Sequence, residues 1–197
     1  MATPKAKLVF PAQVHRWTVD EYHKVGATGL FDDRRVELIE GDIFDMATML
    51  SPHATSVTLA DDVIRQAFGG GWVVRVQVPL TISEITEPMP DIAVVAGKTR
   101  DFKDAHPKSA ALVIEIAESS VDHDRNVKAG LYAQAEVQDY WILNLIERRL
   151  EVYRHPIADT KSKTGYSYAE KLIFSEGDSV SPIAKADVTI AVADLLP

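Results

Sequence analysis

Two acidic side chains stand in sequence that is otherwise apolar. Glu115 lies in the nearly continuous apolar run 110–117, which is typical of a central strand covered on both faces. Asp91 follows Pro90 and opens a second apolar strand, 91–95. Because an isolated buried carboxylate is strongly disfavoured, each acid needs a partner. Two such acids at neighbouring strands could converge on one hard cation, which prefers oxygen ligands.

Each of these residues also has an ordinary structural interpretation. Glu115 could accept hydrogen bonds from helix amides or pair with an arginine. Asp91 could be an ordinary turn residue after proline. Asp124 and Lys128 are four residues apart on a predicted helix, where they could form a surface ion pair of little energetic value. Lys128 nevertheless lies on the helix that leaves the Glu115 strand, close enough in sequence to fold back over the acids.

The elements that must position these residues are indicated by capping residues and apolar periodicity. Thr18 and Glu21 form a capping-box pattern that predicts a short helix. Ser51 as N-cap with Pro52 at the first helical position predicts a longer helix, which Gly69 ends. Predicted strands cover 35–40 and 43–47 as a hairpin, then 72–78, 91–95, 110–117, 140–143, 149–154 and 166–174, and a helix capped by Ser119 or Ser120 runs to about residue 135.

The order of these elements favours an α/β fold. The strand, helix and strand around Glu115 form a crossover unit, and the C-terminal third is predicted as antiparallel edge structure. Residues 161–165 are interpreted as a solvated hairpin loop. The large aromatic residues fall in apolar elements and therefore fit the core or an oligomer interface better than base stacking; they are Trp72, Tyr132, Tyr140 and Trp141.

Composition limits the class of protein. The chain has 197 residues, of which 46% are hydrophobic and 25% charged, and this predicts one folded domain over 1–197. It has no cysteine, which excludes disulfides, thiolate zinc sites and cysteine nucleophiles. The first residues lack the apolar run of a signal peptide and no eighteen apolar residues occur together, so we expect a cytoplasmic protein without a membrane segment.

Charge and missing motifs narrow the function. The formal net charge of −8 argues against a module that binds nucleic acid by phosphate neutralisation alone. It argues less against a metal-dependent nuclease, because such a site needs clustered acids and its bound cations attract phosphate. A serine hydrolase is excluded by the lack of a Gly-x-Ser-x-Gly elbow. The glycines at 69–71 precede a predicted strand, which excludes the dinucleotide-binding fingerprint.

Six blocks of the sequence form a recognisable series. They are 115–120, 124–133 and 140–145, preceded in order by Glu37 with Gly41, by Ser51, Pro52 and His53, and by Pro90 with Asp91. Together these blocks resemble the Uma2 family, also called DUF820. The similarity covers roughly residues 15–155, which makes it more specific than any one short motif.

The Uma2 family is similar to the PD-(D/E)XK nucleases, and this resemblance implies both a fold and a site. The implied fold is a restriction-endonuclease-like core, a mixed central β-sheet flanked by helices with antiparallel hairpins at its ends. The implied site holds Mg²⁺ or Mn²⁺ on Asp91, Glu115 and the carbonyl of Ile116, with Glu37 binding water or a second ion. Lys128 positions the attacking water or stabilises the transition state. The implied activity is endonucleolytic hydrolysis of DNA phosphodiester bonds.

Two positions depart from the family patterns. The usual nuclease motif has lysine two residues after the acid, where this chain has Ala117, and the resemblance implies that Lys128 replaces it from the helix. The family usually has glycine at the position of Glu136, where it fits a left-handed helix end. Glu136 could adopt that conformation at a cost of roughly 1 kcal/mol.

A rival interpretation is a catalytically silent nuclease-fold domain that acts as an interaction or assembly module. The negative charge, Ala117 and the lack of a basic groove beyond 34–35 and 148–149 favour it, whereas Asp91, Glu115 and Lys128 favour a nuclease. For either function a homodimer is expected. For His53 the favoured interpretation is a partly exposed structural residue, with contact to the site as the less favoured alternative, and no role is assigned to the other histidines.

Overall fold

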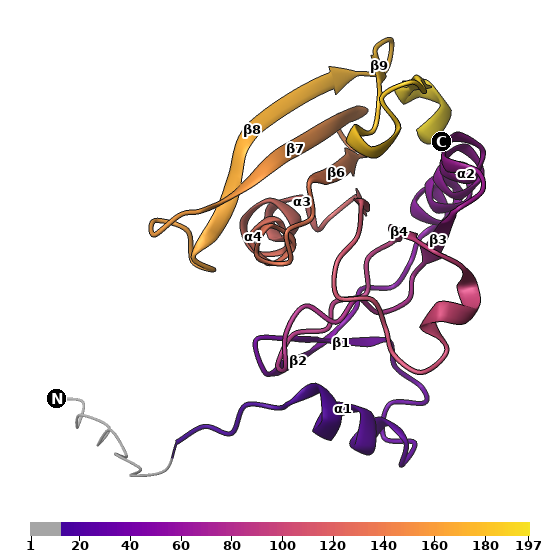
Figure 1. Cartoon of the computed structure of the whole chain (residues 1–197). Helices are drawn as coiled ribbons and strands as arrows, with labels where there is room; N and C mark the ends of the chain where they lie inside the picture. Colours follow the sequence, from indigo (N-terminus) through magenta and orange to yellow (C-terminus); the bar gives the residue numbers. More distant parts are fainter. Residues whose placement is uncertain (1–12) are drawn as a thin grey trace, which may run out of the picture.

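The computed structural model describes residues 13–197, which form a mixed six-stranded sheet with helices on both faces (Figure 1). Counted across the sheet, the third and fourth strands are parallel to each other, and every other pair of neighbouring strands is antiparallel. The spatial order is β3 (Trp72–Val76), β4 (Ile92–Ala96), β5 (Leu112–Ala117), β6 (Asp139–Asn144), β7 (Arg149–Ala158) and β8 (Tyr166–Ser175).

The predicted crossover unit is confirmed between β5 and β6. All six residues of each strand are buried, as expected for strands covered on both faces. The helical segment between them consists of α3 (Val121–His123), a π-helical turn over Asp124–Lys128, and α4 (Ala129–Gln134). The predicted helix to about residue 135 is therefore present, but it is interrupted by a wider turn. Ser120 is the N-cap residue, as one of the two predicted choices, but its hydroxyl bonds the Asp124 side chain and not the helix backbone.

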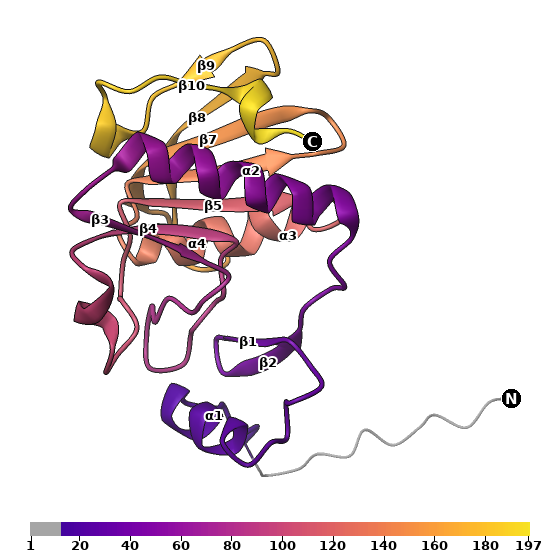
Figure 2. The ribbon, with the colours of Figure 1, turned by 90° about the vertical axis from the view of Figure 1, so that its right-hand side faces the viewer.

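Helix α2 (Ser51–Phe68) covers one face of the sheet, and the π-helical turn with α4 covers the other (Figure 2). Ile64 and Phe68 of α2 pack against Ile92 and Ile114 of the sheet, together with the chain's C-terminal residues. The prediction of Ser51 as N-cap is wrong by one position. Leu50 occupies the cap without a side-chain hydrogen bond, so the start of this helix is set by packing and by Pro52.

The N-terminal elements lie beside the sheet rather than in it. Helix α1 (Val19–Gly26) has the predicted capping box between Thr18 and Glu21. The predicted hairpin is confirmed as β1 (Val36–Ile39) paired with β2 (Asp42–Asp45). Backbone hydrogen bonds between Leu38 and Glu87 attach β1 to the loop before β4. This attachment brings the first hairpin to the end of the sheet at which β4 begins.

The C-terminal part is antiparallel, as predicted, with β7 and β8 forming a long hairpin at one edge of the sheet. Its loop is not simply solvated. The Thr164 hydroxyl lies where a side chain at Gly130 of α4 would stand, so the hairpin end packs on that helix. The remaining elements are short: β9 (Ser179–Val180), β10 (Ile190–Ala191) and 3₁₀ turns over Thr99–Phe102, Ile183–Lys185 and Val192–Leu195.

Further sequence predictions concern the helix end, the aromatic residues and the N-terminus. Glu136 has the predicted left-handed conformation, with φ of 58°. Tyr132, Tyr140 and Trp141 are fully buried in the core, as expected.

No helix in residues 13–197 combines the length and apolar character needed to cross a membrane. The predicted domain over 1–197 and the inference about the N-terminal leader include residues 1–12, which lie outside the described residues.

Candidate active site

Asp91 and Glu115 meet at the junction of two neighbouring strands. The antiparallel register pairs Ile92 with Ile114, and its continuation by one residue sets Asp91 opposite Glu115. Residues directly opposite in such a pair project from the same face of the sheet. The backbone N–H of Ile116 donates to Oδ2 of Asp91 at 2.9 Å, so the aspartate side chain reaches across to β5. The sequence prediction that the two acids come together agrees with this arrangement.

Lys128 approaches these acids from the π-helical turn. Its Nζ lies 3.1 Å from Oε1 of Glu115 and 3.6 Å from Oε2 of Glu37, and only 6% of the residue is exposed. Ala117 is fully buried two residues after Glu115, on the same face of β5. The ammonium group beside Glu115 therefore comes from the helical segment, and the strand position two residues after the acid carries no charge.

Tyr132 completes the environment of Glu115, a role that the sequence interpretation did not assign. Its hydroxyl donates to Oε1 of Glu115 at 2.6 Å, the same oxygen that Lys128 contacts. The sequence feature that could have indicated this role is the four-residue spacing of Lys128 and Tyr132, which sets both side chains on one helix face. Burial raises the pKa of Glu115, although the Lys128 ammonium acts in the opposite direction. Burial alone would lower the pKa of Lys128, but the surrounding carboxylates outweigh it and raise the pKa.

Glu37 and Asp124 bring further carboxylates to the site. Glu37, on β1, is buried and accepts the backbone N–H of Met89 at 3.2 Å. Asp124 is also buried and accepts a hydrogen bond of 2.6 Å from Ser120, which makes the surface ion pair with Lys128 considered from the sequence wrong. Burial raises the pKa of Asp124.

His53 and Gln77 hold the second oxygen of Asp91. The Nε2 atom of His53, in the first turn of α2, lies 3.1 Å from Oδ1 of Asp91, and the Gln77 amide donates to the same oxygen at 3.0 Å. Of the two interpretations of His53, the structure therefore supports the less favoured one, contact with the site. The hydrogen bond with Asp91 raises the pKa of His53. Burial tends to raise the pKa of Asp91, but the hydrogen bonds from His53, Gln77 and Ile116 lower it overall.

These residues line a cavity of about 560 Å³. The acids and Lys128 lie among its lining residues, and the exposed apolar side chains of Phe44, Leu50 and Ile146 also border it. The cavity is large enough for a small group such as a phosphodiester and its adjoining sugars.

The donor set fits a hard divalent cation in its chemistry. Four buried carboxyl groups, those of Glu37, Asp91, Glu115 and Asp124, line the same cavity as one lysine. Oxygen donors without cysteine are the ligands that Mg²⁺ and Mn²⁺ prefer. In residues 13–197, however, these acids do not offer three ligand atoms all within 4.8 Å of one another. An ion would have to draw the carboxylates closer together.

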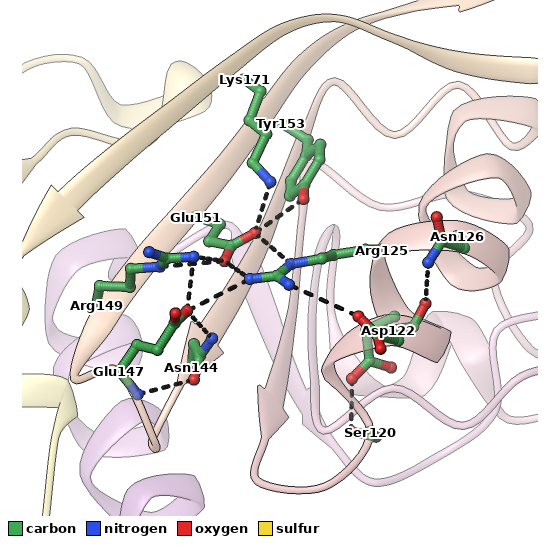
Figure 3. Close-up of polar contacts among 11 residues, drawn as sticks. Ser120, Asp122, Arg125, Asn126, Asn144, Glu147, Arg149, Glu151, Tyr153 and Lys171 are labelled. Atoms are coloured by element: carbon green, nitrogen blue, oxygen red, sulfur yellow. Dashed lines mark hydrogen bonds and ion pairs between the residues drawn. The ribbon is translucent and has the colours of Figure 1, made fainter.

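A polar network beside the site anchors the π-helical turn (Figure 3). Arg125, in the middle of that turn, donates from Nε to Glu151 of β7 at 3.0 Å. Glu151 is fully buried and also accepts bonds from Tyr153 at 2.9 Å, Lys171 at 2.9 Å and Arg149 at 3.1 Å. The network ties the turn that carries Lys128 to the sheet, and it thereby helps to fix the direction of that side chain.

Comparisons with known proteins agree with the fold. A solved nuclease-fold structure, described as a "putative nuclease belonging to DUF820" from Anabaena variabilis ATCC 29413, superposes with a TM-score of 0.66 at 18% sequence identity. The alignment covers 91% of this chain and 97% of that one. No match is found among curated proteins. The family model for Uma2, described as "Putative restriction endonuclease", matches residues 19–193. The chain therefore belongs to the Uma2 family.

Proposed function

We propose that this protein is a metal-dependent endonuclease that hydrolyses phosphodiester bonds in DNA. The observation that carries the proposal is the position of Lys128, whose ammonium group contacts Glu115 beside Asp91 in one cavity. An acid pair can hold a divalent cation, and such an ion together with a buried ammonium group can neutralise the negative charge that develops in phosphoryl transfer. The family description also supports nuclease activity.

In this proposal each residue of the site has a separate role. Asp91, Glu115 and the carbonyl of Ile116 hold Mg²⁺ or Mn²⁺. When bound, the ion lowers the pKa of a coordinated water and neutralises charge on the scissile phosphate. Lys128 stabilises the negative charge that develops on the phosphate, which suits a compact ammonium group. Glu37 orients a water or holds a second ion.

The hydrogen bonds around the two acids support this division. Both oxygens of Asp91 accept hydrogen bonds, from His53, Gln77 and the Ile116 amide, which hold its carboxylate ionised and fixed in direction. One oxygen of Glu115 accepts from both Lys128 and Tyr132. Such contacts orient ligands that would otherwise rotate, so they favour a preorganised site.

Incubation with supercoiled plasmid in the presence of Mg²⁺ or Mn²⁺ tests the activity. We expect cleavage by the wild-type protein, loss with chelator, and loss in Glu115→Gln and Asp91→Asn. Glu84→Gln, which changes an exposed glutamate outside the cavity, is the matched control and retains cleavage. Cleavage that survives Glu115→Gln would contradict the proposed site.

A silent assembly module remains the second candidate, and one observation favours it. Of the arginines at 34–35 and 148–149, which the sequence offered as a basic surface, those at 34, 148 and 149 are each paired with a nearby acid, and Arg35 lines the cavity. Mn²⁺ binding that depends on Asp91 without any DNA cleavage would support this candidate over the nuclease. The pairs are Arg34 with Asp45, Arg148 with Glu176, and Arg149 with Glu147 and Glu151.

We also propose that the protein forms a homodimer. Strand β8 is one of the two edge strands of the six-stranded sheet, and Ile173 on it is 54% exposed. An edge strand with exposed apolar side chains can pair with a second copy. Light scattering after size exclusion should give twice the mass of one chain, and Ile173→Lys should shift it to the monomer. A monomeric mass for the wild-type protein would contradict the proposal.

A further inference from the structure

A second cluster of ligating side chains lies outside the candidate active site. His23 of α1, Glu87 in the loop before β4 and His106 in the loop before β5 offer ligand atoms that all lie within 4.8 Å of one another. The Nε2 atom of His23 is 2.5 Å from Oε1 of Glu87. The two imidazole rings are nearly perpendicular, with centroids 6.2 Å apart. We propose that these three residues bind a transition-metal ion of the Zn²⁺ type.

Glu87 is held in place as a ligand would be. Only 2% of this residue is exposed, and its backbone N–H donates to the Leu38 carbonyl at 2.7 Å. Its second carboxylate oxygen, Oε2, accepts the hydroxyl of Thr81 at 2.5 Å. A hydrogen bond of this kind to the outer oxygen fixes the carboxylate and leaves Oε1 directed at the histidines.

The surroundings leave room for an ion and its water. His23, Glu87 and His106 line a cavity of about 420 Å³ that Thr81 and Phe102 also border. Bonds of about 2 Å from a tetrahedral ion place its ligand atoms about 3.3 Å apart, so Nε2 of His23 and Oε1 of Glu87, which are 2.5 Å apart here, have to separate slightly. The half-exposed side chain of His23 can supply that movement by a small rotation.

The donor types select the class of ion. Two imidazoles and one carboxylate suit Zn²⁺ and its neighbours among the transition metals, whereas Mg²⁺ prefers the all-oxygen set around Asp91 and Glu115. Three protein ligands also leave a fourth position for water. The two sites should therefore be separable by the choice of ion.

Arg75 is the cation that competes at this site. Its Nη2 atom lies 3.0 Å from Nδ1 of His106, and the ion must displace it because a metal and a guanidinium repel each other. Arg75 has other partners to keep, the Pro79 carbonyl at 3.3 Å and the Phe102 ring at 5.5 Å.

The test uses the Asp91→Asn/Glu115→Gln double variant, in which the candidate active site is disabled, so its result is independent of the proposed nuclease function. Titration with Co²⁺ should give visible d–d absorption that saturates at one ion per chain. The band should be lost in His23→Ala and in His106→Ala, while far-ultraviolet circular dichroism stays unchanged. His155→Ala, which removes an exposed histidine on β7, is the control and should retain it.

Two outcomes would overturn the proposal. One is the absence of a saturable Co²⁺ band in the full-length protein. The other is a band that survives both histidine substitutions while the variants remain folded. An independent readout is thermal unfolding, because an ion that binds only the folded state raises the melting temperature. Zn²⁺ should raise it in the parent double variant and leave it unchanged after His23→Ala.

Discussion

Lys128 and Glu115 form a buried ion pair in which an ammonium group from the π-helical turn lies 3.1 Å from a strand carboxylate. Neither residue is more than 6% exposed, so each is the main compensation for the other's charge. Removing one partner from such a pair leaves an uncompensated buried group. The pair is therefore a structural element as well as the proposed centre of the site.

The first prediction is energetic coupling between these two residues. Lys128→Met should lower the free energy of unfolding by about 2–4 kcal/mol, because Glu115 is then buried without its cation. The double variant Lys128→Met/Glu115→Gln should be more stable than the sum of the single effects predicts, with a coupling of about 1–3 kcal/mol. Urea unfolding at pH 7 measures all four proteins. Effects that add to within about 0.5 kcal/mol would contradict direct coupling.

The second prediction concerns His53, whose ring nitrogen is 3.1 Å from Asp91. His53→Ala removes one of the hydrogen bonds that orient the carboxylate, so Mn²⁺ affinity and Mn²⁺-dependent cleavage should fall by about 10–100-fold. His53→Gln, which retains a donor, should recover part of the loss. His155→Ala is the matched control with an exposed histidine. Unchanged Mn²⁺ affinity in His53→Ala would assign this histidine to packing alone.

The third prediction is acid sensitivity arising from Glu151. Burial tends to raise the pKa of Glu151, but hydrogen bonds from Arg125, Lys171 and Tyr153 outweigh it and lower the pKa below its usual 4.5. Because the folded-state pKa is depressed, this carboxylate stabilises the fold fully above the unfolded pKa. That contribution declines as pH falls below about 4.5 toward the folded pKa.

Glu151→Gln should therefore destabilise the protein by about 2–3 kcal/mol at pH 7. The difference from wild type should shrink as the pH is lowered from about 5 to 3, because the wild-type protein loses the ionised carboxylate's contribution. Denaturant unfolding at each pH gives both curves. A difference that is independent of pH over this range would show that the cost comes from packing rather than from charge.

The fourth prediction follows from the left-handed backbone at Glu136, where φ is 58°. Glycine adopts this conformation without steric cost, so Glu136→Gly should raise the free energy of unfolding by about 0.5–1 kcal/mol. Glu136→Ala keeps the Cβ atom and separates the side-chain effect from the backbone effect. If both substitutions change stability equally, the strain is not located at this residue.

Much of the fold could be predicted because local signals agreed with the tertiary structure. The apolar run containing Glu115 is a fully buried central strand, and the capping box at Thr18 begins a helix. Proline before Asp91 marked the start of β4, and adjacency of the two strands then brought the acids together. These features depend on residue type and short spacing, which a single sequence contains.

The rest could not be predicted because it depends on contacts between distant segments. His53 reaches Asp91 across 38 positions of sequence, and nothing in the first turn of α2 indicates that partner. Arg125 pairs with Glu151, which the sequence offers only as one more charge on a strand. The π-helical turn likewise has no compositional signal, since its residues would also form an ordinary α-helix.

In the π-helical turn, the exact number of residues determines whether Arg125 and Lys128 can both reach their partners. Arg125 pairs with Glu151 on β7, and Lys128 pairs with Glu115 on β5. The wider π-helical turn allows one helical segment to make both contacts. Deleting Val127 would close the bulge and rotate everything before it by about 100° relative to α4. One anchor would then have to be released, so a single missing residue, chemically inert in itself, would disconnect the lysine from its acid.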